Sequence, residues 1–286
     1  MGIIISNPLV LNDIQLLISI PSSGRKGEWP LMKWLWYTCM NAPFYIAWNT
    51  FEGRPEDDAR NGIAQHFLKN PTDNFSFRPR PKQKQLHYTH LMMIDDDILP
   101  PPNAFEMVLH NKSVVSAVVF TWREGAPLAL IMKWDEEKQG YRQDKEAINK
   151  LNQGERLVKV DASGTGCFVV KREVYENLVS NWFRFQYDET GRCSLSEDFH
   201  FYQRLREIGY STWIDGKVVC GHIGSVNIQE IQNLLVGASL PASAGAGTVD
   251  RSPRQAGVSG SPSVERAVAQ GFTASPKILP RLEEGK

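Results

Sequence analysis

Short apolar runs alternate with segments of helical character through residues 1–235, and this alternation strongly limits the folds open to the chain. The predicted strands are Ile14–Ile20, Phe44–Trp48, His90–Ile94, Val114–Phe120, Leu128–Trp134, Arg156–Val160, Phe168–Val170, Ser211–Ile214 and Lys217–Cys220. The predicted helices are Pro30–Met40, Pro55–Leu68, Asn103–His110, Glu173–Leu178 and Ser196–Ile208, and the charged stretch Asp135–Gly154 is predicted to be a hairpin or loop. Because strands that alternate with helices form parallel sheets, the sequence predicts the α/β class with a mostly parallel central sheet.

The last part of the chain differs in composition from the rest. Residues 236–286 are rich in Ala, Gly, Ser and Pro, and Phe272 is their only aromatic residue. Such a segment has too little apolar surface to offset the entropy lost on ordering. We therefore predict a single folded domain over residues 1–235 and a disordered, low-complexity tail over residues 236–286.

Charge and cysteine content exclude several classes of protein. The 286 residues include 32 Lys and Arg against 32 Asp and Glu, so bulk positive charge does not favour binding to nucleic acid. The four cysteines are far apart and form no C-x-x-C pair, which indicates free thiols rather than a zinc site or a disulfide scaffold. No apolar run is long enough to cross a membrane, and no basic segment begins a secretory signal. We expect a cytoplasmic protein.

Three aspartates, Asp95, Asp96 and Asp97, follow directly on the apolar run Leu91–Ile94. In extended backbone the first and third of them would share one face and the second would point away. Open α/β sheets bind ligands beyond the carboxyl ends of their strands, and two carboxylates brought together there repel each other unless a cation lies between them. Carboxylate oxygens suit Mg²⁺ or Mn²⁺. The alternative is a solvated acidic turn before the prolines at 100–102.

A second acidic site opens the predicted helix at Ser196. Ser196 is a candidate helix cap, and Glu197 and Asp198 in the first turn complement the helix dipole. The same carboxylates, facing a cleft, are candidates for a general base. Further along, His222 lies between two glycines after a predicted strand. It is either a structural histidine or a nitrogen ligand that completes an aspartate–metal site.

Two loops of small residues and one arginine remain as candidates. The loop at 21–27 follows the first strand, and its backbone amides and basic residues suit a nucleotide phosphate. The loop at 164–166 permits a close backbone approach to a ligand, or a tight turn. Arg60 is expected on the entry side of the sheet; taken alone, it is interpreted as a surface residue.

These pieces, in this order, resemble a GT-A glycosyltransferase of the family 2-like group. The resemblance covers residues 14–225 and is carried by LLISIPSSG, Ala59-Arg60-Asn61, LMMIDDD, GTGCFVVKREVY, SEDFHFYQRLREIGY and GHIG. The Q-x-x-R-W motif of processive synthases is missing, and no membrane-spanning helix follows the domain. The resemblance therefore implies a Rossmann-like nucleotide-diphospho-sugar transferase fold and a non-processive hexosyltransferase.

The resemblance also implies a set of site residues, a nucleotide-sugar donor linked to UDP or GDP, and Mn²⁺ or Mg²⁺ as cofactor. The donor nucleotide would lie near Pro21, Ser22, Gly24, Arg60, Asp95 and Asp96. The metal ligands would be Asp95, Asp97 and His222. Asp198 matches the catalytic base of inverting members, with Glu197 as the alternative, and the loop Gly164, Thr165 and Gly166 would face the donor sugar and the acceptor.

Other functions stay open at this point. A sugar-nucleotide nucleotidyltransferase shares the sheet and the metal, but its usual G-x-G-x-R loop is only partly matched by residues 23–27. A non-catalytic nucleotide-sugar-binding protein is the other alternative. The acceptor hydroxyl can belong to a carbohydrate, a small molecule or a nucleic acid. The basic run at 78–84 suggests phosphate contacts, although a solvated linker is the simpler interpretation.

Overall fold

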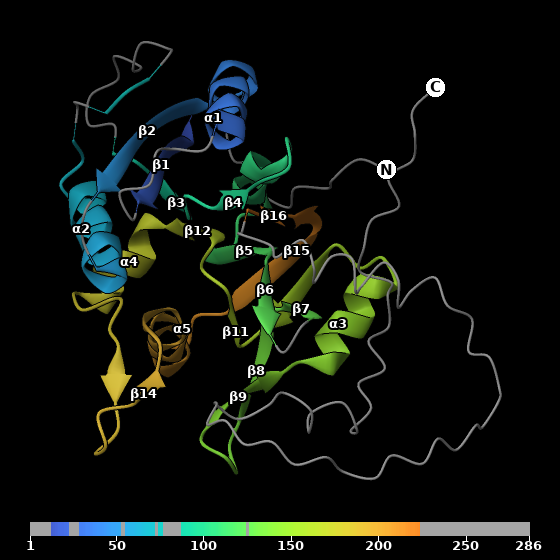
Figure 1. The fold of residues 1–286 in the computed structure, drawn as a ribbon. Coiled ribbons are helices and arrows are strands. Elements are labelled where there is room, and N and C mark those ends of the chain that lie inside the picture. The colour runs from blue at the N-terminus through green and yellow to red at the C-terminus, as the bar shows by residue number, and fades with distance from the viewer. Residues whose placement is uncertain are drawn as a thin grey trace, which may run out of the picture. The chain divides into compact units, whose positions relative to one another are not determined.

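The computed structural model describes residues 13–22, 29–52, 55–71, 74–76, 87–123 and 126–223 (Figure 1). The predicted tail, the proposed boundary at residue 235 and the basic run at 78–84 lie outside the described residues. None of the helices in the described ranges is long and apolar enough to cross a membrane.

A seven-stranded sheet forms the centre of the described chain, in the order β10-β15-β5-β12-β3-β1-β2. Its strands are β1 (Gln15–Ser22), β2 (Tyr45–Glu52), β3 (His90–Ile94), β5 (Val114–Val118), β10 (Leu157–Val160), β12 (Cys167–Lys171) and β15 (Thr212–Val219). The pairs β1–β2, β1–β3 and β5–β15 are parallel, and β12 is antiparallel to both β3 and β5. Since β10 is antiparallel to β15, five strands run one way and β10 and β12 run the other. The predicted mixed α/β architecture with a mostly parallel sheet is confirmed.

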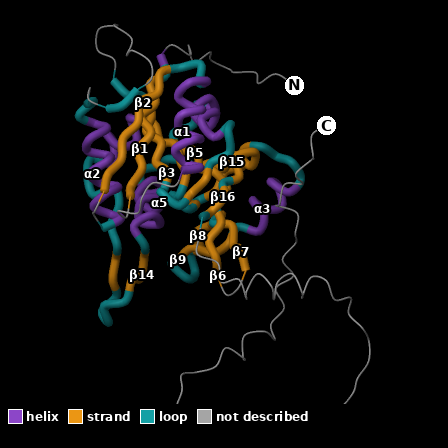
Figure 2. Tube along the Cα trace, turned by 45° about the horizontal axis from the view of Figure 1, so that its top comes forward, coloured by secondary structure: helices purple, strands orange, loops and turns teal. Residues whose placement is uncertain are grey.

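Helices pack on both faces of this sheet (Figure 2). The helices are α1 (Trp29–Asn41), α2 (Glu56–Leu68), the 3₁₀ helix η2 (Ala104–His110), α3 (Lys145–Asn152), α4 (Arg172–Leu178) and α5 (Glu197–Glu207). Apolar residues of α1 and η2 contribute to one core, and those of α2, α4 and α5 contribute to the other. A sheet covered on both faces needs strands that are apolar throughout. The runs in β1 and β3 meet this need, because successive residues such as Leu16 and Leu17 enter opposite cores.

Four small sheets surround the central one, and they account for most departures from the predicted elements. They consist of β11-β8-β9, β13-β14, β16-β4 and β6-β7. Their strands are β4 (Ile98–Leu99), β6 (Phe120–Arg123), β7 (Ala126–Ala129), β8 (Ile131–Asp135), β9 (Gly140–Gln143), β11 (Ala162–Ser163), β13 (Gln186–Tyr187), β14 (Cys193–Leu195) and β16 (Gly221–His222).

Three segments differ from the sequence-based expectation. The expected strand at 128–134 is divided at Leu130 into β7, which pairs with β6, and β8, which pairs with β9 and β11. The segment 135–154, expected to be a hairpin or loop, begins as a hairpin, in which β9 pairs with β8, with Asp135 opposite Gly140. It also contains the unexpected helix α3, which Asp144 caps by accepting from the Ala147 amide at 3.0 Å. The two expected strands at 211–220 form one strand, β15, whose pairing with β5 is irregular between Asp215 and Val219.

Asp215 anchors the strand that leads to His222. Its side chain is fully buried, and His110 Nε2 lies 2.6 Å from Asp215 Oδ2. Arg156 reaches the same oxygen at 3.1 Å, and the Lys217 amide donates to Oδ1 at 3.0 Å. Burial alone would raise the pKa of Asp215, but the hydrogen bonds from His110 and Arg156 hold this pKa below its usual value. The cluster therefore joins η2 to the two strands at this edge of the sheet.

Replacement of Asp215 by Asn is expected to lower the free energy of unfolding at pH 7 by about 1.5–3 kcal/mol, because it removes the charged acceptor of the hydrogen bonds from His110 and Arg156. A carboxyl group whose pKa is lowered by folding stabilises the fold above its unfolded pKa, and that stabilisation is lost as the pH falls through the folded pKa. The difference between the variant and the wild type should therefore shrink below about pH 4. Urea unfolding at pH 7 and pH 3.5 measures it, and a difference that does not depend on pH would contradict the charge-based explanation.

Candidate active site

A pocket of about 460 Å³ lies where β1 and β3 end, at the carboxyl edge of the central sheet. Its lining brings together almost every site residue predicted from the sequence. The predicted residues found in it are Pro21, Ser22, Arg60, Asp95, Asp96, Asp97, Gly164, Thr165, Gly166, Glu197, Asp198 and His222. Gly24 lies outside the described residues. The pocket thus collects residues that are up to 201 positions apart, from Pro21 to His222.

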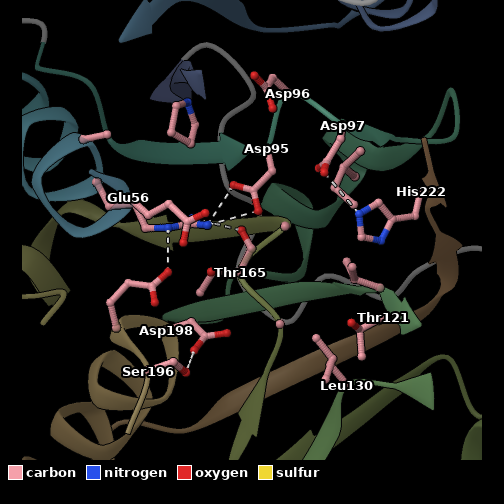
Figure 3. Close-up of a pocket in the computed structure, with 18 of the residues that line it drawn as sticks. Glu56, Asp95, Asp96, Asp97, Thr121, Leu130, Thr165, Ser196, Asp198 and His222 are labelled. Atoms are coloured by element: carbon pink, nitrogen blue, oxygen red, sulfur yellow. Dashed lines mark hydrogen bonds and ion pairs between the residues drawn. The ribbon is translucent and has the colours of Figure 1, made fainter. Parts of the chain in front are cut away.

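The strand ends before the three aspartates, so the extended backbone on which the expectation of alternating faces was based is not present there. β3 ends at Ile94, and the Ile98 amide donates to the Asp95 carbonyl at 3.0 Å, which closes a turn. Each carboxylate consequently meets a different neighbour (Figure 3). Asp95 faces the centre of the pocket, and Asp96 accepts from the Ser22 hydroxyl at 3.0 Å. Asp97 faces His222.

The Asp97–His222 pair is held by backbone pairing. β16 pairs with β4 in antiparallel register, with His222 opposite Ile98, and the Ile223 amide donates to the Asp97 carbonyl at 2.7 Å. His222 Nδ1 lies 2.7 Å from the Phe120 carbonyl oxygen, and His222 Nε2 lies 3.2 Å from Asp97 Oδ2. Because a carbonyl oxygen only accepts, Nδ1 carries the proton of this contact. In the neutral ring, the lone pair of Nε2 then faces the carboxylate.

A lone pair that faces a carboxylate oxygen needs a proton or a metal ion between the two atoms. A ring nitrogen whose partner nitrogen donates to a backbone carbonyl is the usual arrangement of a metal-binding histidine. Two adjacent ligand atoms, each about 2.1 Å from one ion, lie about 3 Å apart, close to the observed separation. Asp97 and His222 would therefore suit as two ligands of a divalent ion; such an ion usually also binds substrate phosphates and water.

Asp95 takes a different partner from the one expected of a metal ligand. Arg60 Nη2 lies 2.8 Å and 3.0 Å from the two carboxylate oxygens of Asp95. No group of three His, Cys, Asp or Glu side chains in the described ranges is placed to hold a metal ion. Coordination by Asp95 stays a prediction.

Arg60 is a buried connector, and its interpretation as a surface residue is wrong. It lies on α2 with 4% of its surface exposed. Besides its bonds to Asp95, it donates from Nη1 to the Thr165 carbonyl at 3.3 Å, and its Nε lies 3.5 Å from Glu197 Oε1. Burial alone would lower the pKa of the guanidinium, but the charges of Asp95 and Glu197 raise it. One cation thus joins the aspartate turn, the glycine loop and α5.

Glu197 and Asp198 face different surroundings although they are neighbours. Glu197 is buried against Arg60, and burial raises its pKa to about 7. Ser196 occupies the N-cap position of α5 as expected, but its hydroxyl makes no cap hydrogen bond. The hydroxyl instead donates to Asp198 Oδ1, which also accepts from the Phe199 amide at 2.7 Å. No described residue hydrogen-bonds to Asp198 Oδ2, and the carboxylate faces the pocket (Figure 3). Of the two candidates for a general base, Asp198 has the accessible oxygen.

The glycine loop owes its small residues to packing. A Cβ atom on Gly164 would lie 2.8 Å from Leu130 Cδ1, and one on Gly166 would lie 3.0 Å from Ile98 Cγ1. The Gly164 carbonyl also accepts from the Ser116 hydroxyl at 3.1 Å. Neither glycine has a positive φ, so close approach of neighbouring side chains explains them, and a tight turn does not.

Sequence reasoning missed part of the lining. The missed residues are Glu56, Ala59, Ile98, Val119, Phe120, Thr121, Leu130, Phe185 and Ser196. Glu56 lies four residues before Arg60 on α2 and three before Ala59, so helical spacing could have placed Glu56 near both. Phe185 lies in a stretch without regular periodicity, and no pattern marks it.

Comparisons with known proteins give similarities of fold at low identity. No family model matches the chain, and no curated protein matches it. A197 from STIV is 15% identical with a TM-score of 0.45, over 74% of this chain and 87% of that one. A Drosophila β1,4-galactosyltransferase 7 variant, in complex with manganese, UDP-Gal and xylobiose, is 11% identical with a TM-score of 0.41, over 74% and 71%. The inositol-1-phosphate CTP transferase from T. maritima is 13% identical with a TM-score of 0.37, over 82% and 99%. None of these TM-scores reaches 0.5, so function is inferred from the pocket itself.

Proposed function

We propose that the protein is a metal-dependent hexosyltransferase that moves a sugar from a UDP- or GDP-linked donor to a hydroxyl acceptor with inversion. The observation that carries the proposal is the facing of His222 Nε2 and Asp97 Oδ2, 3.2 Å apart, in a pocket that also exposes Asp198 Oδ2. His222 Nε2 and Asp97 Oδ2 suit the binding of Mn²⁺ or Mg²⁺, and Asp198 Oδ2 is placed to accept a proton. A divalent ion bound there would neutralise the charge that develops on the departing nucleoside diphosphate.

The remaining groups of the pocket have roles that follow from their contacts. Ser22 and Asp96, hydrogen-bonded at the end of β1, border the space for the donor nucleotide. Arg60 holds the Asp95 carboxylate and the Thr165 carbonyl in fixed positions, so this part of the pocket is already arranged before the donor binds. The Ser196 hydroxyl and the Phe199 amide fix one oxygen of Asp198 and leave the other facing the pocket.

In the proposed reaction the acceptor oxygen attacks the anomeric carbon as the bond from that carbon to the diphosphate oxygen breaks. The hydroxyl proton passes to Asp198 Oδ2, and the bonding electrons leave with the nucleoside diphosphate. General-base assistance of this kind contributes about 10²- to 10⁴-fold to a rate.

A panel of nucleotide sugars tests the proposal. We expect one UDP- or GDP-sugar to raise the melting temperature only with Mn²⁺ or Mg²⁺ present; at 100 times its dissociation constant a ligand stabilises the fold by about 2.7 kcal/mol. Chelation should abolish the shift.

The reaction product separates the proposal from its alternatives. Slow release of nucleoside diphosphate from that donor is the expected result. Release of pyrophosphate from a nucleoside triphosphate and a sugar phosphate would instead indicate a nucleotidyltransferase. Stabilisation by the donor without any turnover would indicate a binding protein.

A further inference from the structure

A two-stranded hairpin extends from the mouth of the pocket. It consists of β13 and β14 and is here called the arm, residues 185–195 (Figure 1). Its first residue, Phe185, lines the pocket, and its second strand runs directly into Ser196 and the Asp198 carboxylate. The arm therefore begins at a residue of the pocket lining and ends next to Ser196, which donates to the proposed base.

Two aromatic rings lie along the arm, and the first of them lines the pocket. Phe185 and Tyr187 are alternate residues, and their ring centroids lie 6.5 Å apart with an interplanar angle of 37°. Phe185 is half-buried, whereas Tyr187 has 63% of its surface exposed. One ring thus borders the pocket and the next lies outside it, in position to meet a part of a ligand that extends beyond the pocket.

The shape of the arm is fixed by its own turn. The Asp188 carboxylate accepts from the Thr190 amide at 2.8 Å and from the Arg192 amide at 3.0 Å, and Gly191 supplies a φ of +78°. An isolated two-stranded hairpin is only marginally stable, and most side chains of β13 and β14 are exposed. The local bonds of Asp188 therefore hold Tyr187 in place.

Charge in the pocket selects against anionic acceptors. The described lining contains the carboxylates of Glu56, Asp95, Asp96, Asp97, Glu197 and Asp198. Arg60 is the only Arg or Lys among the described lining residues, and it is already paired with Asp95. The arm adds Asp188 and Glu189 against Arg192. A phosphorylated acceptor or a nucleic acid would place further negative charge beside these groups.

A neutral sugar ring matches both features of this surface. The hydroxyls of a sugar donate hydrogen bonds to carboxylates. The C–H face of a sugar packs on an aromatic ring such as that of Tyr187, whose ring face is apolar and whose hydroxyl is polar. We propose that the acceptor is a neutral oligosaccharide of at least two rings, whose reacting ring lies against Phe185 and whose next ring lies on Tyr187. This proposal rests on the proposed function, because it names the acceptor of that same site.

The experiment uses the full chain with Mn²⁺ and the nucleoside diphosphate of the donor that the nucleotide-sugar panel selects. An array of neutral and anionic oligosaccharides, single sugars and short RNA is probed first, and the strongest neutral binder then serves as acceptor in steady-state assays. We expect retention of neutral saccharides with two or more rings. Tyr187→Ala should raise the KM for the acceptor roughly 2- to 10-fold relative to the KM for the donor. Tyr187→Phe, which keeps the ring, should have the acceptor KM of the wild type.

Tyr37 supplies the matched control, since it is an exposed tyrosine on α1, with 51% of its surface exposed, outside the pocket lining. Tyr37→Ala should behave as the wild type. Three results on the array would overturn the proposal: retention of anionic ligands or RNA alone, retention of single sugars as strongly as longer ones, and no retention at all. An unchanged ratio of acceptor KM to donor KM in Tyr187→Ala would overturn it as well. Wild-type release of nucleoside diphosphate without acceptor is measured alongside. If no nucleoside diphosphate is released, the proposed function itself is contradicted. If it is released and one of the other results above is obtained, only the proposed role of the arm is contradicted.

Discussion

Replacement of Asp97 by Ala is expected to lower metal-dependent turnover at least about 100-fold, since loss of even an outer partner of a metal site costs about 10- to 100-fold. Asp97 is one of the two side chains that face each other across a gap suited to a divalent ion. Without it, His222 alone remains at that position, and the donor diphosphate meets the acidic pocket without charge neutralisation. Calorimetric titration of the nucleoside diphosphate with and without Mn²⁺, together with the rate of donor hydrolysis, measures the effect.

Asp58 provides the control for this variant. It is an exposed carboxylate in the first turn of α2, near the pocket but not part of its described lining. Asp58→Ala should retain both the Mn²⁺-dependent affinity and the turnover. An Asp97→Ala protein whose nucleotide affinity still responds to Mn²⁺ as in the wild type would show that the metal, if required, binds elsewhere.

Replacement of Asp198 by Asn is expected to lower the rate of transfer by about 10²- to 10⁴-fold while donor affinity is retained. The amide oxygen of Asn can still accept from the Ser196 hydroxyl and the Phe199 amide, so the side chain should keep its position. What is lost is the accessible carboxylate oxygen that would take the proton of the acceptor.

The two variants together test the proposed division of roles. Asp97→Ala should weaken donor binding, and Asp198→Asn should slow chemistry alone. An equal loss of donor affinity in both would refute this division. A product that retains the anomeric configuration of the donor, read by nuclear magnetic resonance, would remove the role of base from Asp198.

Much of the fold followed from local patterns, and the failures have physical causes. The run in β3 is apolar because both faces of the sheet are covered, and its bounds, His90–Ile94, are those predicted. In the segment 135–154 a hairpin was one of two expectations, and α3 was missed because charged and polar residues dominate and its apolar stripe of Ala147, Ile148 and Leu151 is short. The aspartates were placed on alternate faces because a strand was assumed to continue, whereas the Ile98 amide closes a turn at Asp95.

The candidate site was predictable as a set of residues, but its internal pairing was not. The residue types and their order placed Asp97 and His222 in one pocket. Sequence spacing cannot show that Asp95 pairs with Arg60, because that contact joins α2 to the end of β3 through tertiary packing. Nor could it show that the Ser196 hydroxyl donates to Asp198 rather than making a cap hydrogen bond, since both arrangements need the same residues.

The most direct test of the account is a crystal structure of the protein with Mn²⁺ and a nucleoside diphosphate, with the metal located by its anomalous scattering. The account predicts one manganese ion bound to Asp97 Oδ2 and His222 Nε2, with diphosphate oxygens completing its coordination. An ion bound to neither residue, or a nucleotide bound outside this pocket, would contradict it.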